Sequence, residues 1–228
     1  MVVSALVSGG KDSIYSAYLS DTQGRSVDEL LVLKPDDPES LLFHTPNLDL
    51  VKLQAEAWGK QCRFAPVHGT GETAEIAGLR AALEGSSGWV VAGAIASSYQ
   101  WGRLHRLCFE LNRPLYTPLW GKDQGRVVRE EIDAGLDIRV VHLAAEPLTP
   151  ELIGRRLDRS LLEEIEHRSS TVRKVNVAGE GGEFETLVVD APFFGSKLHL
   201  DETEISTAGG ATRWSVRRAH LEPKKGEP

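Results

Sequence analysis

The sequence predicts an α/β protein with a doubly wound parallel sheet and a smaller α+β second domain. Apolar runs of strand length alternate with amphipathic stretches through the first half of the chain. Several of these runs are almost continuously apolar, as expected for strands that are covered on both faces. Near Gly121–Gly125 the alternation stops and shorter β-like segments follow. We therefore expect one domain at residues 1–122 and a second at residues 123–228.

The elements follow in order along the chain. The strands expected in the first domain are Val2–Val7, Glu29–Lys34, Arg63–Val67, Trp89–Ile95 and Leu115–Leu119. The helices expected between them are Ser13–Leu19, one that opens at Thr45-Pro46, Glu72–Leu83 and Ser98–Leu111. In the second domain we expect a strand at Asp137–Ala144, a helical stretch over Pro150–His167, and β-like segments at Lys174–Val177, Phe184–Asp190, Lys197–Leu200 and Thr212–Arg218.

Composition and charge limit the classes of function. The chain has 228 residues, a net charge of −7 and a pI of about 5.5. This acidity argues against a large nucleic-acid surface, because such surfaces need clustered Lys and Arg. Cys62 and Cys108 are isolated, so we expect no zinc site, iron–sulfur site or disulfide framework. No run reaches membrane-spanning length and no signal peptide is recognised, so we expect a cytoplasmic protein without a membrane partner.

The first expected strand leads directly into the segment Ser8–Ser13 and then into a helix. Its two glycines allow a tight turn with accessible N–H groups, and the N-terminus of a helix favours an anion. Lys11 adds a positive charge, the serines add hydroxyl donors, and Asp12 is a candidate Mg²⁺ ligand. The spacing differs from that of a Walker A loop. A glycine turn with a helix cap is the plain alternative, and we expect instead a loop that binds the phosphates of ATP.

A second cluster stands where the fourth expected strand ends and a helix begins. Gly93 and Ala94 would let the backbone approach a nucleotide closely, at the sheet edge where ligands of such folds collect. Gln100, Arg103 and Arg106 recur at helical spacing, away from the apolar stripe of that helix, which includes a tryptophan at position 101. An arginine here could neutralise the α-phosphate or bind a carboxylate. A solvated polar helix face explains the same spacing equally well.

Three carboxylates stand close together in the second half of the chain, at Glu180, Glu183 and Glu185. They could bind ammonium or another cationic group, or remove a proton from ammonium so that ammonia can attack. An acidic surface loop is the plain alternative, and composition alone favours it.

These features occur in one order with other short motifs, and the set resembles the diphthine–ammonia ligases, a branch of the PP-loop ATP pyrophosphatases. The segments that carry the resemblance are Ser8–Ser13, Phe43–Asn47, Gly93–Ile95, Ser98–Gln100, Arg103, Pro118–Trp120 and Glu180–Thr186. The phosphate loop identifies only the superfamily. The Tyr99-Gln100 helix start and the Glu180–Thr186 segment narrow it, and the resemblance extends from the N-terminus to about residue 200.

The resemblance implies an adenine nucleotide alpha hydrolase-like PP-loop fold and an AMP-forming C–N ligase. Its substrate would be translation elongation factor 2 bearing diphthine, whose carboxylate is adenylated by ATP with Mg²⁺. Ammonia would then displace AMP and leave the amide of diphthamide. A homodimer is compatible with the sequence, which does not fix the oligomeric state.

Carried over to this chain, the resemblance also implies roles for single residues. The catalytic residues would be Lys11, Arg103, Glu183 and Glu185. The nucleotide and its metal would be bound by Ser8, Gly9, Gly10, Lys11, Asp12, Ser13, Gly93 and Ala94, with Asp12 as the metal ligand. The diphthine or ammonia side would be formed by Tyr99, Gln100, Arg103, Glu180, Gly181, Gly182, Glu183, Thr186 and Asp190. We expect His44 to be structural.

Two other functions stay open at this point. A tRNA-modifying PP-loop ATPase would need catalytic or cluster-binding cysteines, or a basic platform for RNA. A non-catalytic module that senses ATP or AMP would need only the nucleotide site, because a fold does not determine a function.

Overall fold

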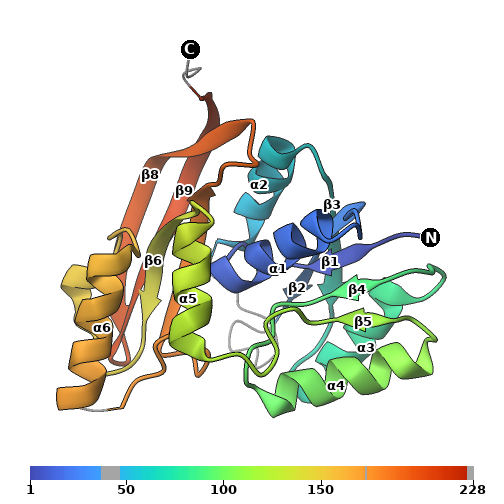
Figure 1. Ribbon diagram of the computed structural model, residues 1–228, viewed down its shortest axis with the longest axis horizontal. Coiled ribbons are helices and arrows are strands. Elements are labelled where there is room, and N and C mark those ends of the chain that lie inside the picture. Colours follow the sequence, from blue (N-terminus) through green and yellow to red (C-terminus); the bar gives the residue numbers. More distant parts are fainter. Residues whose placement is uncertain (37–46, 173, 225–228) are drawn as a thin grey trace. The chain divides into compact units, whose positions relative to one another are not determined.

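The computed structural model describes residues 1–36, 47–172 and 174–224. The chain divides into two compact units, each with its own sheet (Figure 1). Unit 1 comprises residues 1–56 and 60–121, and unit 2 comprises residues 57–59 and 122–228.

Unit 1 is built on a parallel sheet whose five strands, among the described residues, follow the order β3-β2-β1-β4-β5. The strands are β1 (Ser4–Leu6), β2 (Glu29–Pro35), β3 (Gln61–Val67), β4 (Val90–Val91) and β5 (Leu115–Tyr116). Ala5 of β1 lies beside Leu30 of β2 on one side and Val91 of β4 on the other. Each strand falls on a predicted apolar run, although β4 and β5 are much shorter than predicted. Because β1 and β4 are parallel neighbours, the segments that follow them emerge at the same edge.

Helices cover both faces of this sheet, which confirms the doubly wound prediction. The helices α1 (Lys11–Thr22) and α2 (Val51–Trp58) lie on one face, and α3 (Gly71–Leu83) and α4 (Ser98–Glu110) lie on the other (Figure 1). A short 3-10 turn, η1 (Leu48–Leu50), leads into α2. The predicted helix start at Thr45-Pro46 lies outside the described residues.

A hydrophobic core cluster of unit 1 lies between the sheet and the pair α3 and α4. Leu31 and Leu33 of β2 pack there with Leu79 and Leu83 of α3 and Leu107 of α4, all less than 4% exposed. The spacing of 79 and 83 puts both leucines on one helix face, as the sequence predicted. Burying side chains of this size contributes roughly 1.5–3 kcal/mol each relative to exposure.

A buried arginine joins the ends of the strands that lie opposite the phosphate loop. Arg113, only 3% exposed, follows α4 and precedes β5. Its guanidinium donates to the carbonyl oxygen of Gly88 at 3.0 Å, to Ser86 Oγ at 2.8 Å, and to Val2 O, Ser4 Oγ and Trp89 O at 3.2 Å each. Burial lowers the pKa of this guanidinium, although arginine remains charged in proteins. One side chain thus ties β1, the start of β4 and the loop between α3 and β4.

Unit 2 contains an antiparallel sheet of four strands, among the described residues, in the order β7-β6-β9-β8. The strands are β6 (Asp137–Leu143), β7 (Phe184–Asp190), β8 (Ser196–Ala208) and β9 (Ala211–Pro223). Two helices, α5 (Gln124–Asp133) and α6 (Arg159–Thr171), lie on the same side of this sheet (Figure 1). The carboxylates of Asp123 and Asp158 cap them, accepting from the N–H groups of Arg126 and Leu161. Unit 2 is therefore the predicted smaller α+β part.

Two predicted elements of unit 2 were wrong, and one helix was missed. The helical stretch over Pro150–His167 is interrupted, because only Pro150–Leu152 (η2) and α6 are helical. Gly154, with φ of +77°, ends the first turn, and its N–H and the N–H of Leu157 donate to carbonyls of β6. Lys174–Val177 is not a strand, because the N–H and the carbonyl of Val175 both bond to the hydroxyl of Ser169. The helix α5 was not predicted at all.

The predicted segments Lys197–Leu200 and Thr212–Arg218 belong to one long hairpin. Gly209 and Gly210 form its two-residue turn with φ of +58° and +83°, the left-handed pair that favours glycine in hairpins. Most of β8 beyond Leu200 is exposed on both faces, so its sequence lacks the alternation by which a half-buried strand is recognised.

The buried arginine gives a test of stability. We expect Arg113→Met to lower the free energy of unfolding by about 3 kcal/mol, because it leaves several buried acceptors without donors. Denaturant unfolding measures the change. The control Arg106→Met removes an exposed arginine of α4 and should change stability by less than about 0.5 kcal/mol. Equal midpoints for the two variants would contradict the structural role of Arg113.

Candidate active site

The predicted phosphate loop lies between β1 and α1 in unit 1. Gly9 has φ of +84°, which favours glycine, and α1 begins at Lys11. The hydroxyl of Ser13 donates to the carbonyl of Gly10 at 3.0 Å and accepts from the N–H of Ser8 at 3.2 Å. This serine therefore closes the loop across its base. The first-turn N–H groups of α1 have no intrahelical acceptors, so they form a site of positive potential.

Lys11 is the most deeply buried charged group of the loop. Its side chain is 1% exposed, and its Nζ donates to both carboxylate oxygens of Asp12 at 2.7 Å. Asp12 itself is 30% exposed. The pair thus places a cation and an anion together at the start of α1. In place of the other, Lys11 could bind a phosphate and Asp12 could bind a metal ion.

Gly93 brings the end of β4 against the phosphate loop. A Cβ at this position would lie 2.8 Å from the carbonyl carbon and oxygen of Asp12 and 2.9 Å from the amide nitrogen of Ser13. Only glycine permits this approach without a backbone shift. Ala94 and Ile95 follow and are almost fully buried. The structure therefore brings the two predicted nucleotide segments, Ser8–Ser13 and Gly93-Ala94, together.

A buried glutamine that the sequence did not single out supports the loop from α2. The side-chain nitrogen of Gln54, 0% exposed, donates to the carbonyl of Gly9 at 2.9 Å. A Cβ on Gly9 would lie 3.0 Å from Gln54 Oε1 and 3.2 Å from Val51 Cγ2. A glutamine among the apolar residues of an amphipathic helix was the only available signal, and it matches no motif.

Tyr99 and Arg103 lie together on α4 and share a third partner that the sequence did not single out. Arg103 Nε donates to Glu72 Oε1 at 2.6 Å, and the Tyr99 hydroxyl donates to Glu72 Oε2 at 3.0 Å. The guanidinium carbon of Arg103 lies 3.3 Å from the centre of the Tyr99 ring. The bond from Arg103 lowers the pKa of Glu72, while desolvation and then the bond to Glu72 raise the pKa of Tyr99.

Other predicted residues of α4 have different surroundings. The backbone N–H of Gln100 donates to the Ser97 hydroxyl at 3.3 Å, which caps the helix. Trp101 was predicted in the apolar stripe, but its ring stacks with those of Trp120 and His105, at centroid distances of 4.9 and 4.8 Å. The stripe of α4 that packs into the core therefore begins at Leu104.

The acidic segment lies in unit 2 and is folded on itself. Glu183 accepts from the N–H of Gly181 at 2.8 Å and from that of Asn176 at 3.4 Å, so its carboxylate shapes the loop. Glu185 of β7 pairs across the sheet with His142 of β6, and its Oε1 lies 3.8 Å from His142 Nδ1. Both of these side chains are about 15% exposed.

Four more predicted substrate residues lie in or after this loop. Gly182 has φ of +79°, which allows the turn that precedes β7, and Glu180 is partly exposed. Thr186 lies within β7, paired with Val140. Asp190 lies at the opposite end of the seven-residue strand, roughly 20 Å from its first residue. There it accepts from Lys224 Nζ at 2.7 Å.

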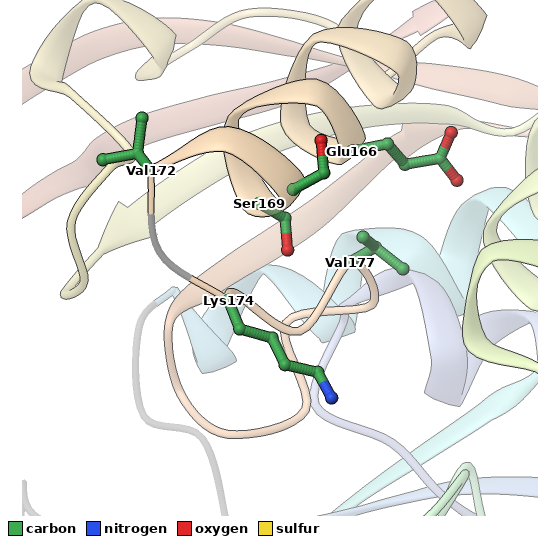
Figure 2. A pocket seen from close by; sticks show the side chains of 6 residues that line it. Glu166, Ser169, Val172, Lys174 and Val177 are labelled. Carbon is green, nitrogen blue, oxygen red and sulfur yellow. The ribbon is translucent and has the colours of Figure 1, made fainter.

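A cavity of 530 Å³ lies within unit 2, beside the last turns of α6 and the segment after it (Figure 2). The residues that line it are Glu166, Ser169, Ser170, Val172, Lys174 and Val177. None of them was predicted as a site residue. Glu166 also forms a salt bridge with Arg129, whose guanidinium nitrogen Nη2 donates to both of its carboxylate oxygens at 2.6 and 2.8 Å.

The described residues contain neither a metal-binding cluster nor a membrane-spanning helix. Within the described ranges, no group of three or more His, Cys, Asp or Glu side chains could hold a metal ion by itself. Over the same part of the chain, no helix is both long enough and apolar enough to cross a lipid bilayer.

Two known protein families together match most of the chain. The family described as diphthamide synthase N-terminal domain matches residues 1–113, and that described as diphthamide synthase C-terminal domain matches residues 123–222. A diphthine–ammonia ligase of Bos taurus is 31% identical over 234 residues, which cover 91% of this chain and 85% of that protein. The diphthine–ammonia ligase of Danio rerio is 31% identical over 227 residues, covering 90% and 88%.

The chain is also similar to solved structures. One of them is described as a predicted subunit of tRNA methyltransferase from Methanocaldococcus jannaschii, and the match covers 84% of this chain and 97% of that one. The TM-score is 0.43 and the sequence identity is 15%, values too low to support a statement about function.

The contact at Gly93 gives a direct test of the nucleotide site. We expect Gly93→Ala to weaken ATP binding at least about tenfold, because the new Cβ displaces the backbone of Asp12 and Ser13. Titration calorimetry with ATP measures the effect. Gly102→Ala is the matched control, since a Cβ at this α4 position meets nothing within 4 Å. Unchanged affinity in Gly93→Ala would show that the loop tolerates the shift.

Proposed function

The chain belongs to the diphthamide synthase family, and from this premise we propose that it is an ATP-dependent diphthine–ammonia ligase. The observation that carries the proposal is the packing of Gly93 against Asp12 and Ser13, which joins both predicted nucleotide segments in one site. The names of the relatives supply the acceptor and the amine. We further propose that the acceptor is diphthine on translation elongation factor 2 and that the reaction takes place in the cytoplasm.

In the proposed first step, an oxygen of the diphthine carboxylate attacks the α-phosphorus of ATP. The bond from that phosphorus to the bridging oxygen breaks, and pyrophosphate leaves with the electron pair. The N–H groups and the buried Lys11 of the phosphate loop would hold the pyrophosphate and stabilise the charge that develops on it. Such a site favours cleavage between the α- and β-phosphates if it retains the leaving group.

The residues present fit one magnesium ion bound mainly by the substrate. Mg²⁺ at nucleotides is usually held by one or two carboxylates together with phosphate oxygens. Asp12 offers one partly exposed carboxylate beside the loop. When bound, the ion would neutralise charge on the phosphates, and Asp12 would release Lys11 to do the same.

In the proposed second step, ammonia attacks the acyl carbon and AMP leaves with the bridging oxygen, giving the amide. The nitrogen must lose a proton, so a carboxylate near the acceptor is needed as a base. We assign this role to Glu185, whose carboxylate lies beside His142. Glu183, predicted with it, would instead keep the loop in shape through Gly181 and Asn176.

The activity itself is tested by incubating the purified protein with ATP, ammonium and elongation factor 2 that bears diphthine. We expect AMP and pyrophosphate, together with the small mass decrease of amidation on the factor. ADP as the nucleotide product, or a factor of unchanged mass, would contradict the proposal. Binding of ATP without pyrophosphate release for any acceptor would favour a nucleotide sensor.

A variant of Lys11 tests nucleotide binding apart from amide formation. We expect Lys11→Ala to weaken ATP binding by about a hundredfold, because it removes the buried positive charge of the loop. The control Lys52→Ala removes an exposed lysine of α2 and should leave ATP binding unchanged. Calorimetry with ATP measures both, and equal affinities would argue against the loop as the phosphate site.

The two carboxylates of the acidic segment are distinguished by paired variants. We expect Glu185→Gln to retain ATP binding and lose most of the amide formation, since the amide cannot accept the proton. Glu183→Gln retains an acceptor oxygen for the loop N–H groups and should lose less activity. The rate of amidation at saturating ATP and ammonium measures both, and the reverse ranking would assign the base to Glu183.

A further inference from the structure

The cluster of Glu72, Tyr99 and Arg103 has the composition of a site for an organic cation. The carboxylate of Glu72 receives hydrogen bonds from the Arg103 guanidinium and the Tyr99 hydroxyl at 2.6 and 3.0 Å. The guanidinium lies over the Tyr99 ring at 3.3 Å. A cation is therefore seated against an aromatic face and a carboxylate at once. In this structure that cation belongs to the chain itself.

The ion pair between Glu72 and Arg103 contributes too little to stability to explain why these residues stand here. The Glu72 side chain is 48% exposed and that of Arg103 is 27% exposed, and ion pairs at such sites contribute little to stability. Glu72 lies in the first turn of α3, and Tyr99 and Arg103 lie in the first two turns of α4; both helices cover the same face of the sheet (Figure 1). Gly93, which contacts the phosphate loop, lies a few residues before α4. Two of the three residues therefore lie on the helix that follows Gly93 in the chain.

The acceptor of the proposed function, on which this inference rests, is a zwitterion. Diphthine carries its reacting carboxylate on the same carbon as a trimethylammonium group. That group has no N–H and cannot donate a conventional hydrogen bond, so proteins recognise it by aromatic faces and by opposite charge. The face of Tyr99 and the carboxylate of Glu72 supply both.

We propose that Tyr99 and Glu72 bind the trimethylammonium group of the acceptor in the place where Arg103 lies in this structure. The guanidinium of Arg103 then moves to the acceptor carboxylate, so that two ion pairs replace one. This exchange recognises both charges of the zwitterion and holds the carboxylate beside the nucleotide. An acceptor whose nitrogen carries no methyl groups fits the site less well.

Two small molecules of the same shape test the cation site directly. Glycine betaine carries a trimethylammonium group one carbon from a carboxylate, and 3,3-dimethylbutanoate has a neutral carbon in place of the nitrogen. We expect glycine betaine to bind the protein at least about tenfold more tightly than the neutral compound, measured by changes in the NMR signals of α4. Equal binding of the two compounds would overturn the inference.

Variants of the cluster locate the effect. Tyr99→Phe keeps the ring and should keep the preference for glycine betaine, whereas Tyr99→Leu and Glu72→Gln should lose it. In the ligase assay, the latter two should raise the KM for diphthine-bearing factor about tenfold or more with unchanged ATP binding. Phe109→Leu, which removes an 80% exposed ring from the same helix, is the matched control and should change neither. Retention of the preference in Tyr99→Leu would contradict the inference.

The outcomes also separate this inference from the proposed function. Preferential binding of glycine betaine without ligation would leave the cation site in place and remove diphthine as the substrate. Ligation that is unaffected by Tyr99→Leu and Glu72→Gln would support the proposed function and remove the cation site.

Discussion

The candidate nucleotide site of unit 1 depends on the close approach of Gly93 to the backbone of Asp12 and Ser13. This approach is possible because β1 and β4 are parallel neighbours whose following segments emerge at one edge, and because no Cβ stands between them. From α2, Gln54 and Val51 confine Gly9 in the same way. The loop is thus held by its surroundings before a ligand arrives, and little conformational entropy has to be lost when phosphates bind.

Much of unit 1 could be predicted from sequence because its signals are local and strong. Buried parallel strands such as Leu30–Leu33 are continuous apolar runs, and the glycine loop stands directly between strand and helix. Unit 2 was harder. The helix α5 is short and has few apolar residues, although these lie on one face, and the outer half of β8 is exposed on both faces and lacks the alternation of a half-buried strand. The break after Leu152 is marked locally only by Gly154, and the hydrogen bonds to β6 that fix it are tertiary.

The candidate site shows the same division between local and tertiary information. The loop residues could be recognised from spacing, but Gln54 and Glu72 acquire their roles only when α2 and α3 fold against the loop and α4. The acidic segment shows a further limit. The sequence shows how many carboxylates this segment has, but it does not show which groups each carboxylate contacts. Glu183 turns back onto its own loop, while Glu185 faces a histidine of the neighbouring strand.

The hydrogen bonds of Arg113 affect which substitutions its neighbours in the fold can tolerate. Of its acceptors, those of Val2, Gly88 and Trp89 are main-chain carbonyls, which every amino acid carries. Substitution of Val2 or Trp89 changes the side chain and leaves the acceptor in place. The arginine therefore places little demand on the identity of these partners, because their main-chain oxygens remain when their side chains are substituted.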